Sequence, residues 1–308
     1  FGASAAAQEQ ATTYLRIGAL GLPPMLVLLA VTGALRGLLD TRTPMLVAVA
    51  GFAVNIALNL AFVHGFHWGI AGSAWGTVIA QTGMALALTA VLLRKARATH
   101  APLRPHPGRV LAAARNGIPL VVRTLALRGA ILLTVWAAAV LGDAPLAAHQ
   151  IAATVWSFLA FALDALAIAA QAVVGRDLGA GRVDTARAVM RTLLRWGLLF
   201  GLAVGTLTAA AAGLVPRLFS SDPAVIGYAV PALLVVAAGQ VVAGYVFVAD
   251  GVLMGAGDFR YLAWAMVVAL AAYAPVVLFV RALGVWGEPG RVLVWLWGGY
   301  TAFMLARA

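Results

Sequence analysis

The sequence predicts an all-α protein that crosses a membrane several times. Of its 308 residues, 63% are hydrophobic and only 10% are charged, and the mean hydropathy is +0.98. A soluble domain of this size needs much more charge on its surface. Several apolar runs reach the roughly 20 helical residues that cross a bilayer core. The short alternating segments of a membrane β-barrel are absent from the sequence.

Nine membrane spans are expected along the chain. They lie at about residues 13–36, 44–64, 70–93, 117–141, 147–175, 189–214, 224–256, 261–283 and 291–307. Arginine and lysine gather in every second loop, most densely between Arg94 and Arg115. By the positive-inside rule these loops and the C-terminus are cytoplasmic. Topology thus accounts for the net charge of +11, and we expect no nucleic-acid partner.

A ten-residue pattern occurs twice, 218 positions apart, at the ends of the first and seventh spans. The corresponding residues are Gly33, Leu35, Gly37, Asp40 and Arg42 in the first copy, and Gly251, Leu253, Gly255, Asp258 and Arg260 in the second; Trp68–Gly69 and Trp286–Gly287 keep the same register. Glycines four apart let a neighbouring helix come close. The motif is therefore either a packing and turn device or a hinge between lobes.

The repeat predicts two related lobes, as is typical of transporters. Residues 1–93 would hold the last three helices of an N-lobe, 94–116 a cytoplasmic linker, and 117–308 a six-helix C-lobe. Three spans precede the second copy of the motif within its half, and none precedes the first. We therefore expect three further helices upstream, which makes two pseudo-symmetric lobes of six helices.

Polar side chains inside the predicted spans mark the candidate site. Asp164 and Asp250 are the two acids there, and an unpaired Asp at the bilayer centre costs about 2.5–3.5 kcal/mol. Asp164 shares one helix face with residues spaced three and four apart: Gln150, Thr154, Ser157, Phe161, Ile168, Gln171 and Gly175. This face lines either a wet cavity or a packed hydrogen-bond network.

Three other charged residues bear on this site. Asp250 lies about 9 Å from the cytoplasmic end of its helix, so it is either a cavity group or reaches towards the headgroups. Arg123 is expected to reach the headgroups. Arg128, near mid-bilayer, can pair with Asp164, which would keep that acid ionised; without the pair, Asp164 suits proton exchange.

The N-terminal part offers uncharged polar groups only. Asn55 and Asn59 share one face of a span, and Ser73, Thr77 and Gln81 share a face of the next. They are either interhelical hydrogen-bonding groups or ligands for a cation or an organic substrate. The histidines, His149 among them, lack a metal spacing and are expected to contact water. We expect no metal, no cofactor and no enzyme, because cysteines, nucleotide loops and catalytic groupings are missing from the sequence.

These motifs resemble multidrug and toxic compound extrusion (MATE) transporters of the DinF-like branch. The resemblance rests on Leu15–Pro44, Gly69–Gln81, Arg123–Leu125, Ala147–Gln150 and Ala162–Gly181. It implies a twelve-helix, two-lobed antiporter of the bacterial inner membrane that exports organic, cationic compounds using a proton or sodium gradient. It also implies that Asp164 is the leading coupling group, and Asn59 departs from a family pattern that has an acid there.

Two other functions stay open at this point, namely a flippase for a lipid-linked precursor and a non-transporting membrane scaffold. A flippase needs a strongly cationic cavity, for which only Arg123 and Arg128 offer charge. The expected partners are membrane lipid and a small organic molecule, and we expect a monomer.

Overall fold

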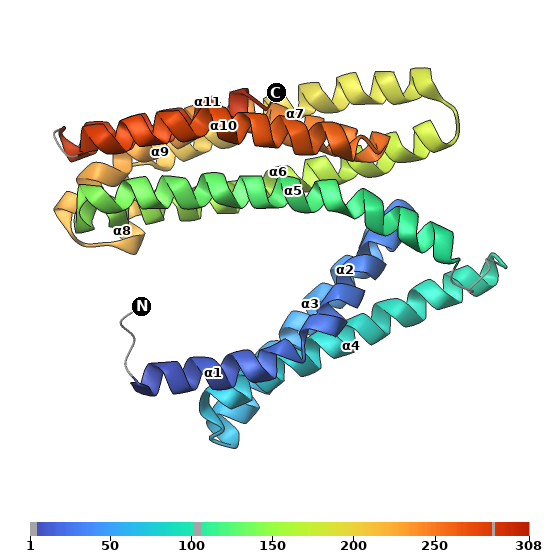
Figure 1. The fold of residues 1–308 in the computed structure, drawn as a ribbon. Helices are drawn as coiled ribbons and strands as arrows, with labels where there is room; N and C mark the ends of the chain where they lie inside the picture. Colours follow the sequence, from blue (N-terminus) through green and yellow to red (C-terminus); the bar gives the residue numbers. More distant parts are fainter. Residues whose placement is uncertain (1–4, 101–105, 285–286, 308) are drawn as a thin grey trace. The chain divides into compact units, whose positions relative to one another are not determined.

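Every secondary-structure element that the computed structural model describes is a helix. The structure describes residues 5–100, 106–284 and 287–307, and the chain divides into two compact units, Phe1–Pro105 (unit 1) and His106–Ala308 (unit 2) (Figure 1). In the described residues, seven helices are long and apolar enough to cross a membrane, or eight if a bent helix pair counts as one span. The predicted all-α, multi-pass membrane fold is confirmed.

Unit 1 is built around α4 (Gly69–Ala98), which packs against the three preceding helices. These are α1 (Ala5–Ala19), α2 (Leu22–Gly37) and α3 (Arg42–Asn59), which continues into a π-helical turn at Leu60–Gly65. The predicted first span, 13–36, is not one straight helix. Its two parts meet at 49°, because the proline pair Pro23–Pro24 cannot continue a helix yet fits the first turn of a new one.

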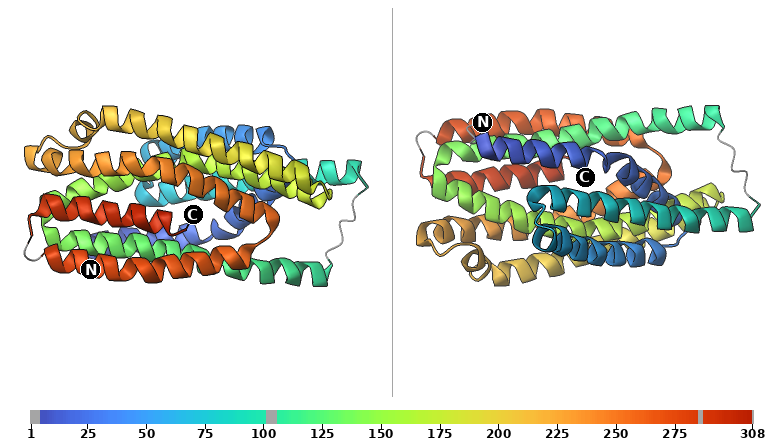
Figure 2. Two further views of the ribbon diagram at one scale, coloured as in Figure 1. Left: turned by 90° about the horizontal axis from the view of Figure 1, so that it is seen from above. Right: turned by 90° about the horizontal axis from the view of Figure 1, so that it is seen from below.

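Unit 2 contains a long helix, α9 (Pro223–Ala256), that packs against α6 (Asp143–Gly179), α7 (Val183–Ala211) and α11 (Pro289–Leu305). A second group pairs α5 (Pro107–Ala138) with α10 (Phe259–Gly284), which also packs against α11. A 3-10 turn, Ala139–Leu141, follows α5, and α8 (Val215–Phe219) is a short link before α9. The long helices run roughly along one direction (Figure 2). The α11 helix has 17 residues, fewer than the roughly 20 that cross a bilayer without thinning it.

Small residues let α9 lie very close to its neighbours. A Cβ added at Gly205 of α7 would lie 2.5 Å from the carbonyl oxygen of Ala237. At Gly251 it would overlap the carbonyl of Ala167 on α6, and at Gly255 it would lie 2.6 Å from that of Gln171. The packing role of the glycines is thus confirmed for the second copy of the motif. Gly33 and Gly37 differ, since an added Cβ meets no described atom within 4 Å.

Both copies of the motif form the same turn between two helices. The Asp40 N–H donates to the Leu35 carbonyl at 2.9 Å, and the Asp258 N–H to the Leu253 carbonyl at 3.1 Å. The residue before each aspartate has positive φ, +60° at Leu39 and +79° at Gly257. Each carboxylate then accepts the N–H three residues on, that of Thr43 at 3.0 Å and of Tyr261 at 3.1 Å. The motif therefore ends one helix and caps the next. Trp286 lies outside the described residues.

The segment predicted as a linker is partly helical. The α4 helix continues through Ala98 and α5 begins at Pro107, so both helices extend into residues 94–116. Residues 101–105 lie outside the described part of the chain.

Candidate functional site

Three charged side chains meet inside unit 2. Arg123 of α5 donates from Nη2 to Oδ2 of Asp250 on α9 at 2.7 Å, and Arg307, which follows α11, donates to the same oxygen. The side chains of Arg123, Asp250 and Arg307 are 18%, 10% and 4% exposed. Two cations thus share one buried anion, which leaves this cluster with a formal charge of +1. We call it the Arg–Asp–Arg cluster.

This cluster excludes one of the two alternatives for Asp250 and corrects the expectation for Arg123. Asp250 does not reach towards the headgroups, because it is buried against both arginines. Arg123 does not reach them either, because its guanidinium points to Asp250. Sequence reasoning missed Arg307, which lies beyond the last helix and folds back onto α9. The sequence feature that could have indicated such a residue is Asp250 itself, since an acid inside a span usually has a cationic partner.

Asp164 lies on α6, which packs against α9, the helix that carries Asp250. The Asp164 side chain is exposed in unit 2. Within the described residues, no ion pair joins it to a cation, and the possible Arg128–Asp164 pair is not formed. Arg128 is exposed on α5. With Asp164 ionised, the Arg–Asp–Arg cluster and this fourth group together carry no net charge.

The polar stripe of α6 does lie on one face of the helix. Its exposed members are Gln150, Thr154, Ser157, Phe161, Asp164 and Gln171, while Ile168 and Gly175 are half-buried. The opposite face, with Leu163, Ala167 and Ala170, is buried. The hydroxyls of Thr154 and Ser157 donate to the carbonyls of Gln150 and Ala153, both at 2.8 Å. Their oxygens stay free to accept, so within unit 2 this face can offer ligands.

The polar groups of unit 1 bond mainly to each other and to their own helices. The Asn55 amide donates to the Thr77 hydroxyl at 3.4 Å, which joins α3 to α4. The Asn59 amide donates to the Asn55 carbonyl at 2.8 Å, and Thr77 donates to the Ser73 carbonyl at 3.0 Å. These contacts are interhelical and intrahelical hydrogen bonds of the kind expected in membranes. Gln81 and Thr77 also line a pocket of about 380 Å³ between α4 and the bend of α1 and α2.

The charged residues of the repeated motif lie in or next to the turns between helices. Asp40 pairs with Lys95 at 2.5 Å. The hydrogen bond from Lys95, followed by those from Thr43, lowers the pKa of Asp40 to about 2. Arg42, Asp258 and Arg260 are exposed.

His149 was expected to contact water, and this was wrong. Its side chain is 2% exposed, and its ring lies 5.4 Å from that of Trp297 between centroids. An aromatic neighbour and the apolar surroundings of α11 enclose it.

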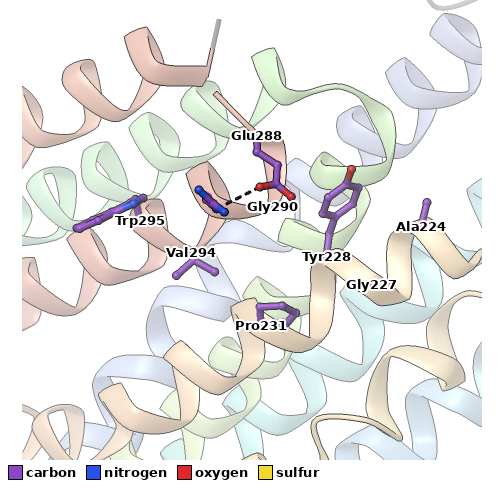
Figure 3. Close-up of a pocket in the computed structure, with 9 residues that line it drawn as sticks. Ala224, Gly227, Tyr228, Pro231, Glu288, Gly290, Val294 and Trp295 are labelled. Carbon is purple, nitrogen blue, oxygen red and sulfur yellow. Dashed lines mark ion pairs between the residues drawn. The ribbon is translucent and has the colours of Figure 1, made fainter. Parts of the chain in front are cut away.

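A further pocket, of about 700 Å³, lies at the N-terminal ends of α9 and α11. Tyr228, Pro231 and Trp295 line it, and Glu288 pairs with Arg291 at 3.1 Å on its rim (Figure 3). Pro231 is 19 residues before Asp250 on α9, which corresponds to roughly 28 Å. This pocket is therefore separate from the Arg–Asp–Arg cluster.

Known proteins match nearly the whole chain. The MatE family model matches residues 1–61 and 119–280. Protein DETOXIFICATION 43 of Arabidopsis thaliana is 34% identical over 297 residues, which are 96% of this chain and 54% of that protein. DNA damage-inducible protein F of Escherichia coli (strain K12) is 29% identical over 292 residues, 92% of this chain and 62% of that one. The chain thus spans about half the length of the plant relative.

The fold matches solved structures as well. One, described as the outward-facing conformation of a multidrug resistance MATE family transporter of the MOP superfamily, has a TM-score of 0.88 at 20% identity. The match covers 100% of this chain and 69% of that one. A crystal structure of MATE in complex with MaL6 gives a TM-score of 0.87 at 21% identity, with the same coverage. The family match and the 34% identity show that this chain belongs to the MATE (MatE) family, whose proteins are membrane transporters and not enzymes.

Proposed function

We propose that the full-length protein is a secondary exporter of organic, cationic compounds. It works by alternating access between two lobes and is driven by a proton or sodium gradient. Two findings support this. The first is the family match, and the second is similarity to the probable multidrug resistance protein NorM of Idiomarina loihiensis (strain ATCC BAA-735 / DSM 15497 / L2-TR), which is 26% identical over 297 residues. In this proposal the protein is a monomer of a bacterial inner membrane, has a cytoplasmic C-terminus and needs no cofactor.

The observation that carries the proposal is the difference between the two acids of unit 2. Asp250 is held by two arginines. Asp164 has no ion pair within the described residues and stands on the exposed polar face of α6. An ionisable group inside a span faces a cavity or a partner, since contact with lipid is costly. Asp164 is therefore the acid that is available to a mobile cation.

The negative charge of Asp164 then explains how one cation is exchanged for another. A proton, a sodium ion or a cationic substrate can each neutralise Asp164, and one excludes another. When any of these three cations neutralises Asp164, the charge of +1 on the Arg–Asp–Arg cluster is no longer balanced. The proton, the sodium ion and the substrate therefore have the same electrostatic effect on the cluster.

A flippase of lipid-linked phosphates is less well supported. It needs cations that are free to bind phosphate, and both arginines of the cluster are engaged by Asp250. A scaffold without transport would make Asp164 dispensable.

The test is efflux of a fluorescent organic cation from cells that carry the full-length gene. Asp164→Asn should abolish efflux while the amount of protein in the membrane stays unchanged. The matched control is Asp143→Asn, the same substitution at the exposed start of the same helix, which should keep normal efflux. Normal efflux by Asp164→Asn would reject Asp164 as the coupling group.

A further inference from the structure

A groove runs between α5 and α10 at one end of unit 2. Its volume is about 430 Å³, and Ile118, Pro119 and Val122 line it from α5, with Arg260, Trp264 and Val267 from α10. The two helices pack side by side (Figure 1). Trp264 is 70% exposed. The groove is therefore mostly apolar, with an aromatic side chain on its edge and an arginine at its end.

The two helices are parallel through their length. Residues near 120 face residues near 264 in the groove. Further along, the Thr134 hydroxyl lies 2.8 Å from the Tyr273 hydroxyl, and Arg281 donates to the Trp136 carbonyl at 2.8 Å. Sequence numbers thus rise together on both helices, and their N-terminal ends lie at the same side of the membrane.

Each helix carries an arginine at the same place relative to the groove. On α10 the lining begins with Arg260 and continues three, four and seven residues later. On α5, Arg115 precedes Ile118, Pro119 and Val122 by three, four and seven residues. It therefore lies on the groove face of α5, one turn before the lining residues. Two arginines flank the end of the groove.

These arginines are not neutralised. Within the described residues, neither Arg115 nor Arg260 takes part in an ion pair. Asp258, two residues before Arg260, uses its carboxylate to cap α10 through the Tyr261 N–H. Pro119 adds an acceptor, because a proline has no N–H to give to the carbonyl four residues earlier, that of Arg115. The end of the groove thus offers two cations and a carbonyl that lacks its usual helical donor.

We propose that this groove binds an anionic phospholipid with a hydroxylated headgroup, of the phosphatidylglycerol type. The phosphate lies between Arg115 and Arg260, a headgroup hydroxyl donates to the Arg115 carbonyl, and an acyl chain follows Ile118, Val122 and Val267. Basic pockets between membrane helices on the cytoplasmic side bind anionic headgroups in this way. By the positive-inside rule, the loop charges put the N-terminal ends of α5 and α10 on that side, and Trp264 lies one turn after Arg260 near the start of α10.

Native mass spectrometry of the purified full-length protein tests this proposal. The protein is titrated with dioleoyl phosphatidylglycerol and, in parallel, with dioleoyl phosphatidylcholine. We expect tighter binding of phosphatidylglycerol, weakened about five-fold by Arg115→Gln or by Arg260→Gln and roughly thirty-fold by both together. Arg191→Gln, an exposed arginine of α7 on the same side, is the matched control and should leave binding unchanged.

A second measurement tests where the acyl chain binds, without changing either arginine. Phosphatidylglycerol with brominated acyl chains should quench tryptophan fluorescence, and Trp264→Phe should remove that part of the quenching. Equal affinity for the two lipids would overturn the proposal, as would an equal loss in Arg191→Gln. Competition by soluble glycerol phosphate at the same concentration as the lipid would also overturn it, because the site would then be one for free phosphate.

Discussion

Asp250→Asn is the most informative change to the Arg–Asp–Arg cluster. It keeps the shape of the side chain and removes the negative charge that Arg123 and Arg307 share. Their side chains are 18% and 4% exposed, so water cannot replace the lost partner. Removing one partner of a buried ion pair costs about 3–5 kcal/mol. For a unit of this size that corresponds to a fall in Tm on the order of 6–20 °C.

The assay is thermal unfolding of the purified protein in detergent, followed by tryptophan fluorescence. Asp184→Asn is the control, because its carboxylate is 99% exposed and its pair with Arg187 at 3.5 Å lies on the surface. That change should move the Tm by less than about 2 °C. Adding Arg307→Gln to Asp250→Asn should restore part of the loss, since one unpaired buried charge disappears. Equal melting of Asp250→Asn and Asp184→Asn would refute the reasoning.

Three other predictions concern the repeated motif, and each is checked by thermal unfolding. Gly251→Ala should destabilise by about 1–3 kcal/mol, because the new methyl meets the Ala167 carbonyl; Gly33→Ala, at the equivalent position with open space, should be neutral or stabilising. Leu39→Gly should stabilise by about 1 kcal/mol, since φ is +60° there; a loss would show that the Leu39 side chain matters more than its backbone. The lowered pKa of Asp40 adds stability that is complete above about pH 4 and is lost as the pH falls towards 2. The pH profile of Asp40→Asn should lack this step, so the stability difference between the wild type and the variant should shrink as the pH falls from about 4 to 2. Parallel profiles of the two proteins would contradict this.

The fold was largely predictable because a bilayer imposes simple rules on sequence. Long apolar runs have to become helices, and their limits follow from charges and turn residues. The break at Pro23–Pro24 was the main miss, since a broken span has the same hydropathy as a straight one. The repeated motif was readable because its aspartates and its positive-φ position are local features of the chain.

The site was predictable only in part. The face of α6 follows from helical periodicity, which is local, so the grouping of Gln150, Ser157, Asp164 and Gln171 was correct. The partners of Asp250 come from α5 and from the residues after α11, and which arginine reaches it depends on tertiary packing. Arg128 was considered only as a partner of Asp164, and no partner was predicted for Asp250, which Arg123 and Arg307 contact. The burial of His149 also depends on a distant helix, α11, and local sequence did not show it.

Water access along α6 is the most direct test of the central idea. The 308 residues contain no cysteine, so single cysteines can be introduced and labelled one at a time. Cysteine substitutions at Ser157, Asp164 and Gln171 should react quickly with a charged, water-soluble maleimide in membranes, whereas those at Leu163 and Ala167, 1% and 4% exposed, should not. If the first three resist that reagent and react only with an uncharged, membrane-soluble maleimide, this face lies against acyl chains and Asp164 does not serve a water-filled transport path.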